Sequence, residues 1–131
     1  MSHSHKEIKT SRAPAAIGPY SQAVRAGDFL YVSGQIPLDP ETGEIVEGGI
    51  AEQAERVFKN LQAILNKADL DFPDVVKAEV FLDDINNFAA VNEIYARYFT
   101  SDPMPARQAI EAANLPKLVM VEISCIAYCP V

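Results

Sequence analysis

The segment between residues 104 and 128 constrains the fold of this chain most strongly. It predicts two strands joined by a turn at residues 114–117, and the second strand alternates between two sets of side chains. One set is Val119, Val121, Ile123, Cys125 and Ala127, and the other is Leu118, Met120, Glu122, Ser124, Ile126 and Tyr128. Because a sheet in a small monomer usually leaves one face in water, two largely apolar faces predict a covering layer or a second subunit.

Two charged residues stand out in this apolar segment. Glu122 lies among apolar neighbours, and Arg107 shares its face of the first strand with Ala109, Glu111 and Ala113. An Arg can bind a carboxylate through two parallel hydrogen bonds, and a half-buried Glu can position or activate a water molecule. Together they outline a site for a small carboxylic acid. An interface salt bridge from Arg107 to Glu111 or Glu122 is the alternative, and the residues alone favour it.

Three further strands are predicted from alternating or β-branched segments. Residues 21–25 and 29–35 form the first two, joined by a turn at residues 26–28, and residues 75–82 form the third. In the third strand, the side chains expected beneath a helix are Val76, Ala78, Val80 and Leu82. A loop with one short strand near residues 44–46 is expected before the first helix.

Two helices are predicted from apolar residues that recur at intervals of three and four positions. The first covers residues 50–68, and the second covers residues 88–99, with a buried line made of Phe88, Val91, Tyr95 and Tyr98. The order of elements predicts an α+β fold with two helices on one face of a mixed sheet. The other face carries large apolar side chains, namely Tyr31, Phe81, Met120, Ile126 and Tyr128. We therefore expect self-association through that face.

Composition predicts one cytoplasmic domain spanning residues 1–131, with residues 1–12 as a flexible arm. A chain of 131 residues, 49% hydrophobic and 22% charged, is typical of a soluble globular protein. No apolar stretch has the length of a secretory signal or a membrane span, so no membrane partner is expected. The net charge of -7 argues against nucleic acid as a partner, although a local basic patch is compatible with it.

The cysteines and histidines predict neither a disulfide nor a metal site. Cys125 and Cys129 lie four positions apart on one predicted strand, roughly 13 Å, which is too far for a bond between them. His3 and His5 lie near the amino terminus without a cluster of Cys or carboxylate groups nearby. We expect no metal and no cofactor.

Five short stretches, which together span most of the chain, match one known family in their order. They are residues 13–23 (APAAIGPYSQA), residues 32–37 (VSGQIP), Phe88 with Val91, Asn92 and Tyr95, residues 105–107 (PAR), and residues 115–117 (LPK) with residues 121–123 (VEI). This set resembles the Rid proteins (reactive intermediate deaminases, also called YjgF-like). The resemblance implies a chorismate-mutase-like two-layer fold, assembled as a homotrimer with clefts between subunits.

The resemblance also implies an activity, the hydrolysis of 2-imino acids to 2-oxo acids and ammonia. Substrates of this class, 2-iminobutanoate and 2-iminopropanoate, are reactive products of pyridoxal-phosphate enzymes. By resemblance, Arg107 is the clamp for the substrate carboxylate, and Glu122 holds the attacking water. Such a reaction needs orientation and a delivered water rather than a nucleophilic side chain, so the absence of a Ser-His-Asp or Cys-His set is compatible with it.

Five more residues are assigned to the cleft by resemblance. Tyr20, Ser33 and Asn92 match cleft positions, Gly34 is similar to the residue whose backbone lies beside the ligand, and Ala109 stands where many members have Cys. Ala109 leaves the chemistry in place but puts the size of the substrate in question. In structural terms alone, Tyr20 would pack in a turn, Ser33 would bind a backbone group, and Asn92 would be solvated.

A second departure from the family is Leu118, where Gly often follows the Leu-Pro-Lys run, and it is expected to stiffen that turn. Two alternative functions stay open, an endoribonuclease that inhibits translation and a non-catalytic trimer that binds small metabolites. The acidic net charge and the lack of a His pair outside the amino-terminal arm weigh against RNA cleavage. A carboxylate clamp serves binding as well as catalysis.

Overall fold

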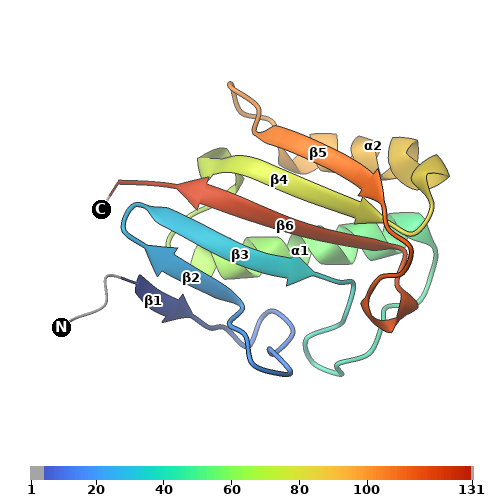
Figure 1. The fold of residues 1–131 in the computed structure, drawn as a ribbon, viewed down its shortest axis with the longest axis horizontal. Helices are drawn as coiled ribbons and strands as arrows, with labels where there is room; N and C mark the ends of the chain where they lie inside the picture. The colour runs from blue at the N-terminus through green and yellow to red at the C-terminus, as the bar shows by residue number, and fades with distance from the viewer. Residues whose placement is uncertain (1–4, 131) are drawn as a thin grey trace.

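Six strands form one sheet in the order β1-β2-β3-β6-β4-β5 in the computed structural model, which describes residues 5–130. Their bounds are β1 His5–Ile8, β2 Ala23–Ala26, β3 Phe29–Gln35, β4 Val75–Leu82, β5 Ala106–Glu111 and β6 Val121–Tyr128. Neighbouring strands are antiparallel except β4 and β5, which run parallel (Figure 1). The predicted mixed sheet is therefore confirmed.

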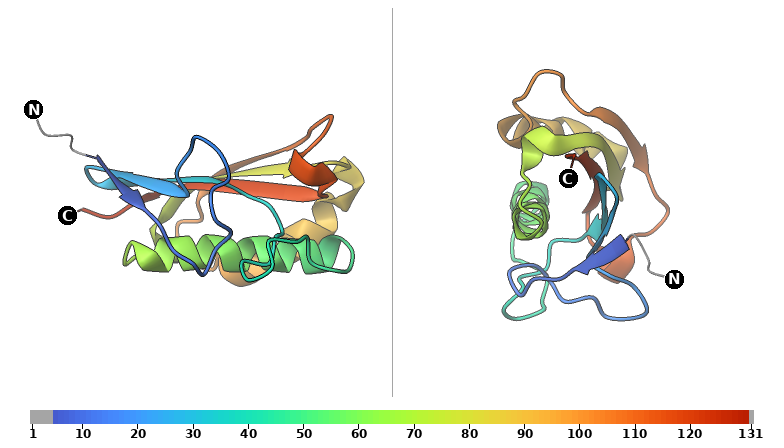
Figure 2. Two further views of the ribbon diagram at one scale, coloured as in Figure 1. Left: turned by 90° about the horizontal axis from the view of Figure 1, so that it is seen from below. Right: turned by 90° about the vertical axis from the view of Figure 1, so that its left-hand side faces the viewer.

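Both helices, α1 Ile50–Lys67 and α2 Phe88–Tyr98, cover the same face of this sheet (Figure 2). Short 3-10 helices lie at η1 Phe72–Asp74, η2 Ile85–Asn87 and η3 Pro116–Leu118. At the start of α1, the Glu52 carboxylate accepts the backbone N–H of Gly49 at 2.8 Å, which satisfies a donor that the helix leaves unpaired. The α+β arrangement with two helices on one face is confirmed.

The core lies between the helices and β6, the strand whose alternation is the clearest signal in the sequence. Val121, Ile123, Cys125 and Ala127 are buried beneath α1, while the intervening side chains lie on the face without helices. We call this second surface the open face. Tyr31 and Tyr128 keep 48% and 42% of their surface exposed there, so large aromatic rings contact solvent in the single chain. This surface is the one for which the sequence predicts self-association.

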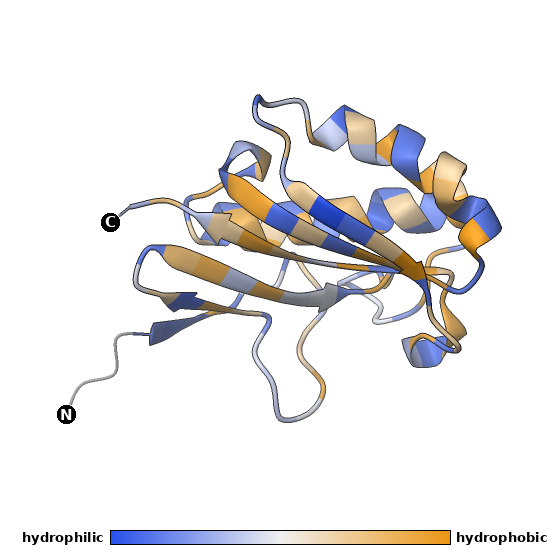
Figure 3. Ribbon diagram, turned by 45° about the horizontal axis from the view of Figure 1, so that its top comes forward, coloured by the Kyte–Doolittle hydropathy of each residue, from blue (hydrophilic) through white to orange (hydrophobic). Residues whose placement is uncertain are grey.

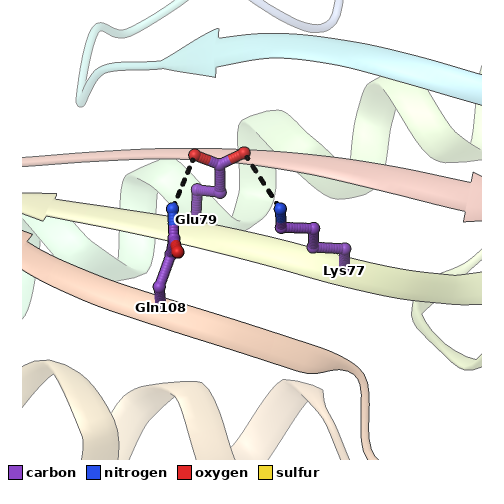
Figure 4. Close-up of polar contacts among 3 residues, drawn as sticks. All are labelled: Lys77, Glu79 and Gln108. Carbon is purple, nitrogen blue, oxygen red and sulfur yellow. Dashed lines mark hydrogen bonds and ion pairs between the residues drawn. The ribbon is translucent and has the colours of Figure 1, made fainter.

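A polar cluster interrupts the open face near its β5 edge. The Lys77 ammonium lies 3.9 Å from one carboxylate oxygen of Glu79, and the Gln108 amide donates to the other at 3.4 Å (Figure 4). Hydrophilic and hydrophobic residues accordingly alternate along β4 (Figure 3). The open face therefore combines exposed aromatic side chains with a group of polar side chains.

Three local predictions are corrected by the structure. The sequence predicted an arm over residues 1–12, but His5–Ile8 form the edge strand β1, which pairs with β2. Val76, expected beneath a helix, is 43% exposed, and Val75 is buried instead. The register between β4 and β6 shifts there, so an extra residue reverses the alternation. In α2 the buried residues are Val91, Ile94 and Tyr95, whereas Phe88 and Tyr98 are half-buried.

Two smaller expectations concern cysteines and membranes. Cys125 and Cys129 are both free thiols, as their predicted separation requires. In the part of the chain that the structure describes, no helix is both long and apolar enough to cross a membrane. His3 lies outside the described residues.

Candidate functional site

Glu122 lies on the open face of β6, in direct contact with the backbone of Gly34. It is opposite Phe81 of β4 in the strand register and is half-buried. The register between β3 and β6 shifts between Val32 and Gln35, which is where Gly34 meets the carboxylate. A Cβ atom placed on Gly34 would lie 2.5 Å from Glu122 Oε2, closer than real contacts allow. A side chain at this position would therefore displace the Glu122 carboxylate, so glycine acts here through space rather than through its backbone angle.

Burial raises the pKa of Glu122 above the usual value of 4.5 for a glutamate. The cause is loss of water around the carboxylate, which disfavours its charged form. A higher pKa makes Glu122 a stronger base toward a water molecule once it has lost its proton. The environment is therefore suited to accepting and returning a proton.

A hollow of about 500 Å³ opens beside Glu122 and brings together four of the residues predicted for the cleft. They are Tyr20, Ser33, Gly34 and Glu122, and Gln22, Ile36 and Lys117 also line the wall. Tyr20 is 53% exposed, so its ring borders the hollow instead of packing inside a turn. Ser33 Oγ donates to the Ser21 carbonyl at 2.6 Å, which fixes its position through the backbone contact expected on structural grounds.

Arg107 occupies a second location, between β5 and α2. Its guanidinium carbon lies 5.2 Å from the ring centre of Phe88 and 4.7 Å from that of Tyr95, and the group donates to Oδ1 of Asn92. Two aromatic faces and one amide thus orient the planar guanidinium group. The hollow at this location measures about 380 Å³ and is also lined by Ala109.

Within residues 5–130 of the single chain, Arg107 forms no salt bridge with Glu111 or Glu122, and the predicted alternative, a salt bridge across an interface, stays a prediction. The ion pairs found within residues 5–130 are Lys77–Glu79 and Glu93–Arg97. Glu111 instead accepts the backbone N–H of Ile85 at 2.9 Å. Arg107 is exposed and therefore presents a cation without a carboxylate partner in the single chain.

Arg107 and Glu122 project from opposite faces of the sheet. Arg107 is opposite Ala78, which is buried beneath the helices, and its contacts are with α2. Glu122 is opposite Phe81, which lies on the open face. One chain therefore carries two half-sites, one with Arg107, Asn92 and Ala109 and one with Glu122, Gly34, Ser33 and Tyr20.

The sequence predicted Asn92 as a cleft residue and Phe88 and Tyr95 as part of a buried helix face, but it did not predict that these three residues orient Arg107. Phe88, Asn92 and Tyr95 follow one another at four- and three-residue spacing, so they share one face of α2. Two aromatic residues flanking an amide on one helix face were the available signal. The turn after Pro116 also lines the first hollow, and both Lys117 and Leu118 adopt left-handed backbone angles, with φ of 55° and 57°.

Metal chemistry receives no support from the ligands that the structure places together. Across residues 5–130, no group of three or more His, Cys, Asp or Glu side chains is arranged to hold a metal ion. The two half-sites hold an arginine, a glutamate, hydroxyl groups and amides. Such a set can bind a carboxylate, position water and move a proton.

Comparison of this chain with known proteins shows the family to which it belongs. The sequence profile described as Endoribonuclease L-PSP matches residues 10–129. The 2-iminobutanoate/2-iminopropanoate deaminase of Rattus norvegicus is 54% identical over 122 residues, which cover 93% of this chain and 88% of the relative.

Two solved structures share the fold over almost their whole length. The Rid family protein YyfA of Yersinia pestis superposes with a TM-score of 0.92 at 46% identity, covering 95% of this chain and 99% of the other. TdcF of E. coli, with bound serine, gives 0.88 at 43% identity and covers 95% and 98%. The family profile, the sequence relative and the solved structures each match nearly all of the chain. This protein therefore belongs to the Rid family, also described as the Endoribonuclease L-PSP family.

Proposed function

We propose that this protein hydrolyses 2-imino acids to 2-oxo acids and ammonia, with 2-iminobutanoate and 2-iminopropanoate as the substrate class. The observation that carries the proposal is the exposed guanidinium group of Arg107, oriented by Phe88, Tyr95 and Asn92 and free of any carboxylate partner within residues 5–130. Holding a cation in this way before a ligand arrives reduces the cost of ordering it on binding. A planar α-carboxylate fits such a group through two parallel hydrogen bonds.

The active cleft in this proposal forms between two copies of the chain. Arg107 and Glu122 project from opposite faces of the sheet, so a substrate that contacts both requires the α2 side of one copy to lie against the open face of the next. The exposed aromatic rings of that face support burial in an assembly. Head-to-tail contacts of this kind close into a ring, and we propose a homotrimer of chorismate-mutase-like type with three equivalent clefts.

The chemistry then requires one water and one proton carrier. The imine carbon is electrophilic once its nitrogen is protonated, so water held by Glu122 adds to that carbon while the carboxylate accepts a proton from it. Glu122 then returns this proton to the nitrogen of the carbinolamine, and the carbon–nitrogen bond breaks as the hydroxyl group loses its proton and becomes the carbonyl of the 2-oxo acid. Ammonia leaves, and the hydroxyl proton passes through Glu122 to ammonia or to solvent. Arg107 keeps the substrate carboxylate in place throughout, which contributes through orientation.

Two relatives support this substrate class. The Rattus norvegicus relative carries the deaminase activity in its name, and the TdcF structure holds serine, an α-amino acid with the same carboxylate group. Serine binding by TdcF also favours a second candidate, a trimer that binds small metabolites without turnover. The two candidates differ in whether Glu122 is needed for release of product.

The test is a coupled assay in which a threonine dehydratase generates the imine and release of the 2-oxo acid is followed. Arg107→Lys keeps the charge but loses the planar fork, so we expect kcat/KM to fall about 10²-fold or more with the melting temperature nearly unchanged. Arg97→Lys is the matched control, because Arg97 is exposed on α2 and its ion pair within residues 5–130 is with Glu93. Normal rates for Arg107→Lys would remove Arg107 as the clamp.

Binding without turnover has a distinct outcome. Calorimetry with 2-oxobutanoate would show uptake by the unmodified protein and loss of uptake in Arg107→Lys, while the coupled assay would show no acceleration by either. The endoribonuclease alternative predicts cleavage of single-stranded RNA by the unmodified protein, without acceleration in the coupled assay. Acceleration by the unmodified protein, lost in Arg107→Lys, is the result that supports the deaminase.

A further inference from the structure

A strongly basic hollow lies away from both half-sites, between the segment after β1 and the exposed side of α1. Its volume is about 680 Å³, within the range of small-molecule sites. Five cationic side chains line it, namely Lys9, Arg12, Arg56, Lys59 and Lys67. The segment after β1 crosses to the helix side of the sheet (Figure 2), and the hollow is lined by residues of this segment and of α1.

The charge of this hollow is opposite to that of the whole protein. The chain has 18 acidic and 11 basic residues, yet no Asp or Glu lines the hollow and five of the basic residues do. None of the five belongs to an ion pair within residues 5–130. Carboxylates lie only in adjoining hollows, where Glu52, Glu55 and Glu93 share walls with Arg56 and Lys59, and Glu7 shares one with Lys9. Inside this hollow the cations repel one another, and an anion between them relieves that repulsion.

The segment that supplies Lys9 and Arg12 is fixed in place. The buried side chain of Gln22 accepts the backbone N–H of Thr10 at 2.8 Å and donates to the carbonyl groups of Thr10 at 3.0 Å and Pro14 at 2.8 Å. Ala13, in the middle of the segment, is 2% exposed. The cations on either side of the hollow are therefore presented by two ordered elements, which lowers the entropy cost of binding a ligand between them.

We propose that this hollow binds a small ligand carrying two or more phosphate groups. Lysine ammonium groups bind phosphate oxygens as point charges, and arginine binds them through its fork of donors. The hydroxyl group of Ser11 and the side-chain amides of Gln62 and Asn66 line the same wall and add neutral donors. A long nucleic acid fits less well, because beyond the hollow it meets the surface of a chain with a net charge of -7.

The experiment measures binding of inorganic tripolyphosphate, ATP and orthophosphate by calorimetry in about 0.15 M salt, together with the shift in melting temperature. We expect tripolyphosphate and ATP to bind at least about tenfold more tightly than orthophosphate, because the cations act together on a ligand with several charges. The double variant Lys59→Gln, Lys67→Gln should weaken both on the order of tenfold.

The matched control is the double variant Lys6→Gln, Arg97→Gln, which removes the same number of positive charges from outside the hollow. It should bind tripolyphosphate within about twofold of the unmodified protein, since neither side chain lines the hollow and charges without direct contact to the ligand are weakened by salt screening. Equal losses in the two double variants would overturn the proposal, because binding would then follow net charge alone. Absence of measurable tripolyphosphate binding would overturn it as well.

Two further outcomes separate the ligand classes. A short single-stranded RNA that binds more tightly than ATP, and loses affinity in Lys59→Gln, Lys67→Gln, would replace the small ligand with nucleic acid. ATP that binds more tightly than tripolyphosphate would support the proposal and add contacts to the nucleoside. Both measurements are independent of the imine hydrolysis assay, so they stand whichever way that assay comes out.

Discussion

At the scale of single residues, Glu122 is placed where a charge is costly. Because its folded pKa lies above the usual glutamate value, the folded state binds a proton more readily than the unfolded state does. The contribution of Glu122 to stability is therefore most favourable at low pH. It declines as the pH rises from the usual value of 4.5 through the folded pKa.

The decline of this stability contribution with rising pH leads to a prediction for Glu122→Gln. The variant lacks the charge that burial disfavours, so at pH 7 its melting temperature should equal or exceed that of the unmodified protein, and any difference should vanish in acid. Imine hydrolysis should fall on the order of 10²-fold, the usual scale for a general base, while binding of 2-oxobutanoate persists. Thermal scans across pH and the coupled assay measure both effects on one preparation.

The acid side of the pH profile provides the complementary measurement. In the unmodified protein, kcat/KM should decline below a pKa that lies above 4.5, and Glu122→Gln should lose this dependence. Unchanged hydrolysis by Glu122→Gln would remove Glu122 from the mechanism.

Gly34 provides a second prediction at this scale. Because a Cβ there would lie 2.5 Å from Glu122 Oε2, Gly34→Ala should displace the carboxylate while β3 keeps its backbone. We expect a loss of hydrolysis similar to that of Glu122→Gln. The double variant should be no worse than either single variant, since both act on one group. Additive losses in kcat/KM would show that Gly34 contributes independently of Glu122.

At the scale of elements, the turn at η3 stores strain. Leu118 has φ of 57°, a left-handed conformation that destabilises a residue with a side chain. Because Leu118 is 77% exposed, packing of its side chain in the single chain does not offset this strain. Leu118→Gly should raise the free energy of unfolding by about 0.5–1 kcal/mol, or roughly 2–4 °C in melting temperature. Leu118→Ala keeps the strain and should give no such gain. An equal gain in Leu118→Ala would assign the effect to the exposed leucine side chain instead.

Helices and strands whose apolar residues recur at a regular interval were predictable from the sequence. The alternation of β6 and the apolar stripe of α1 both matched the structure, because burial on one face repeats at a fixed interval. The strand β1 was missed, since four residues of mostly polar character at a sheet edge carry no apolar pattern. Val76 was assigned to the wrong face, because a single extra residue in a strand leaves no mark on composition.

The sequence predicted which residues belong to the site, but it did not predict on which face of the sheet each of them lies. Resemblance named Arg107 and Glu122, but the face of each strand depends on its register with β4, which is set by residues distant in sequence. The contact of Gly34 with Glu122 likewise depends on a register shift between β3 and β6. These features belong to pairing between strands, and local patterns do not encode them.

At the scale of the whole molecule, the open face predicts the state of assembly. Size-exclusion chromatography with light scattering should give about three times the chain mass of 14.3 kDa. Replacing Tyr31 with Lys places a charge within the aromatic part of that face, so it should yield smaller species and abolish hydrolysis together. A monomer of the unmodified protein at micromolar concentration would contradict the trimer and the cleft between copies.

The placement of Arg107 and Glu122 on opposite faces of the sheet has a genetic consequence. If each cleft takes its arginine from one copy and its glutamate from the next, two inactive proteins can repair each other. Arg107→Lys and Glu122→Gln, refolded or expressed together in equal amounts, should restore about a quarter of the clefts, because each cleft draws its two contributors independently. Cells that carry both defective alleles would then hydrolyse imines that cells with either allele alone do not.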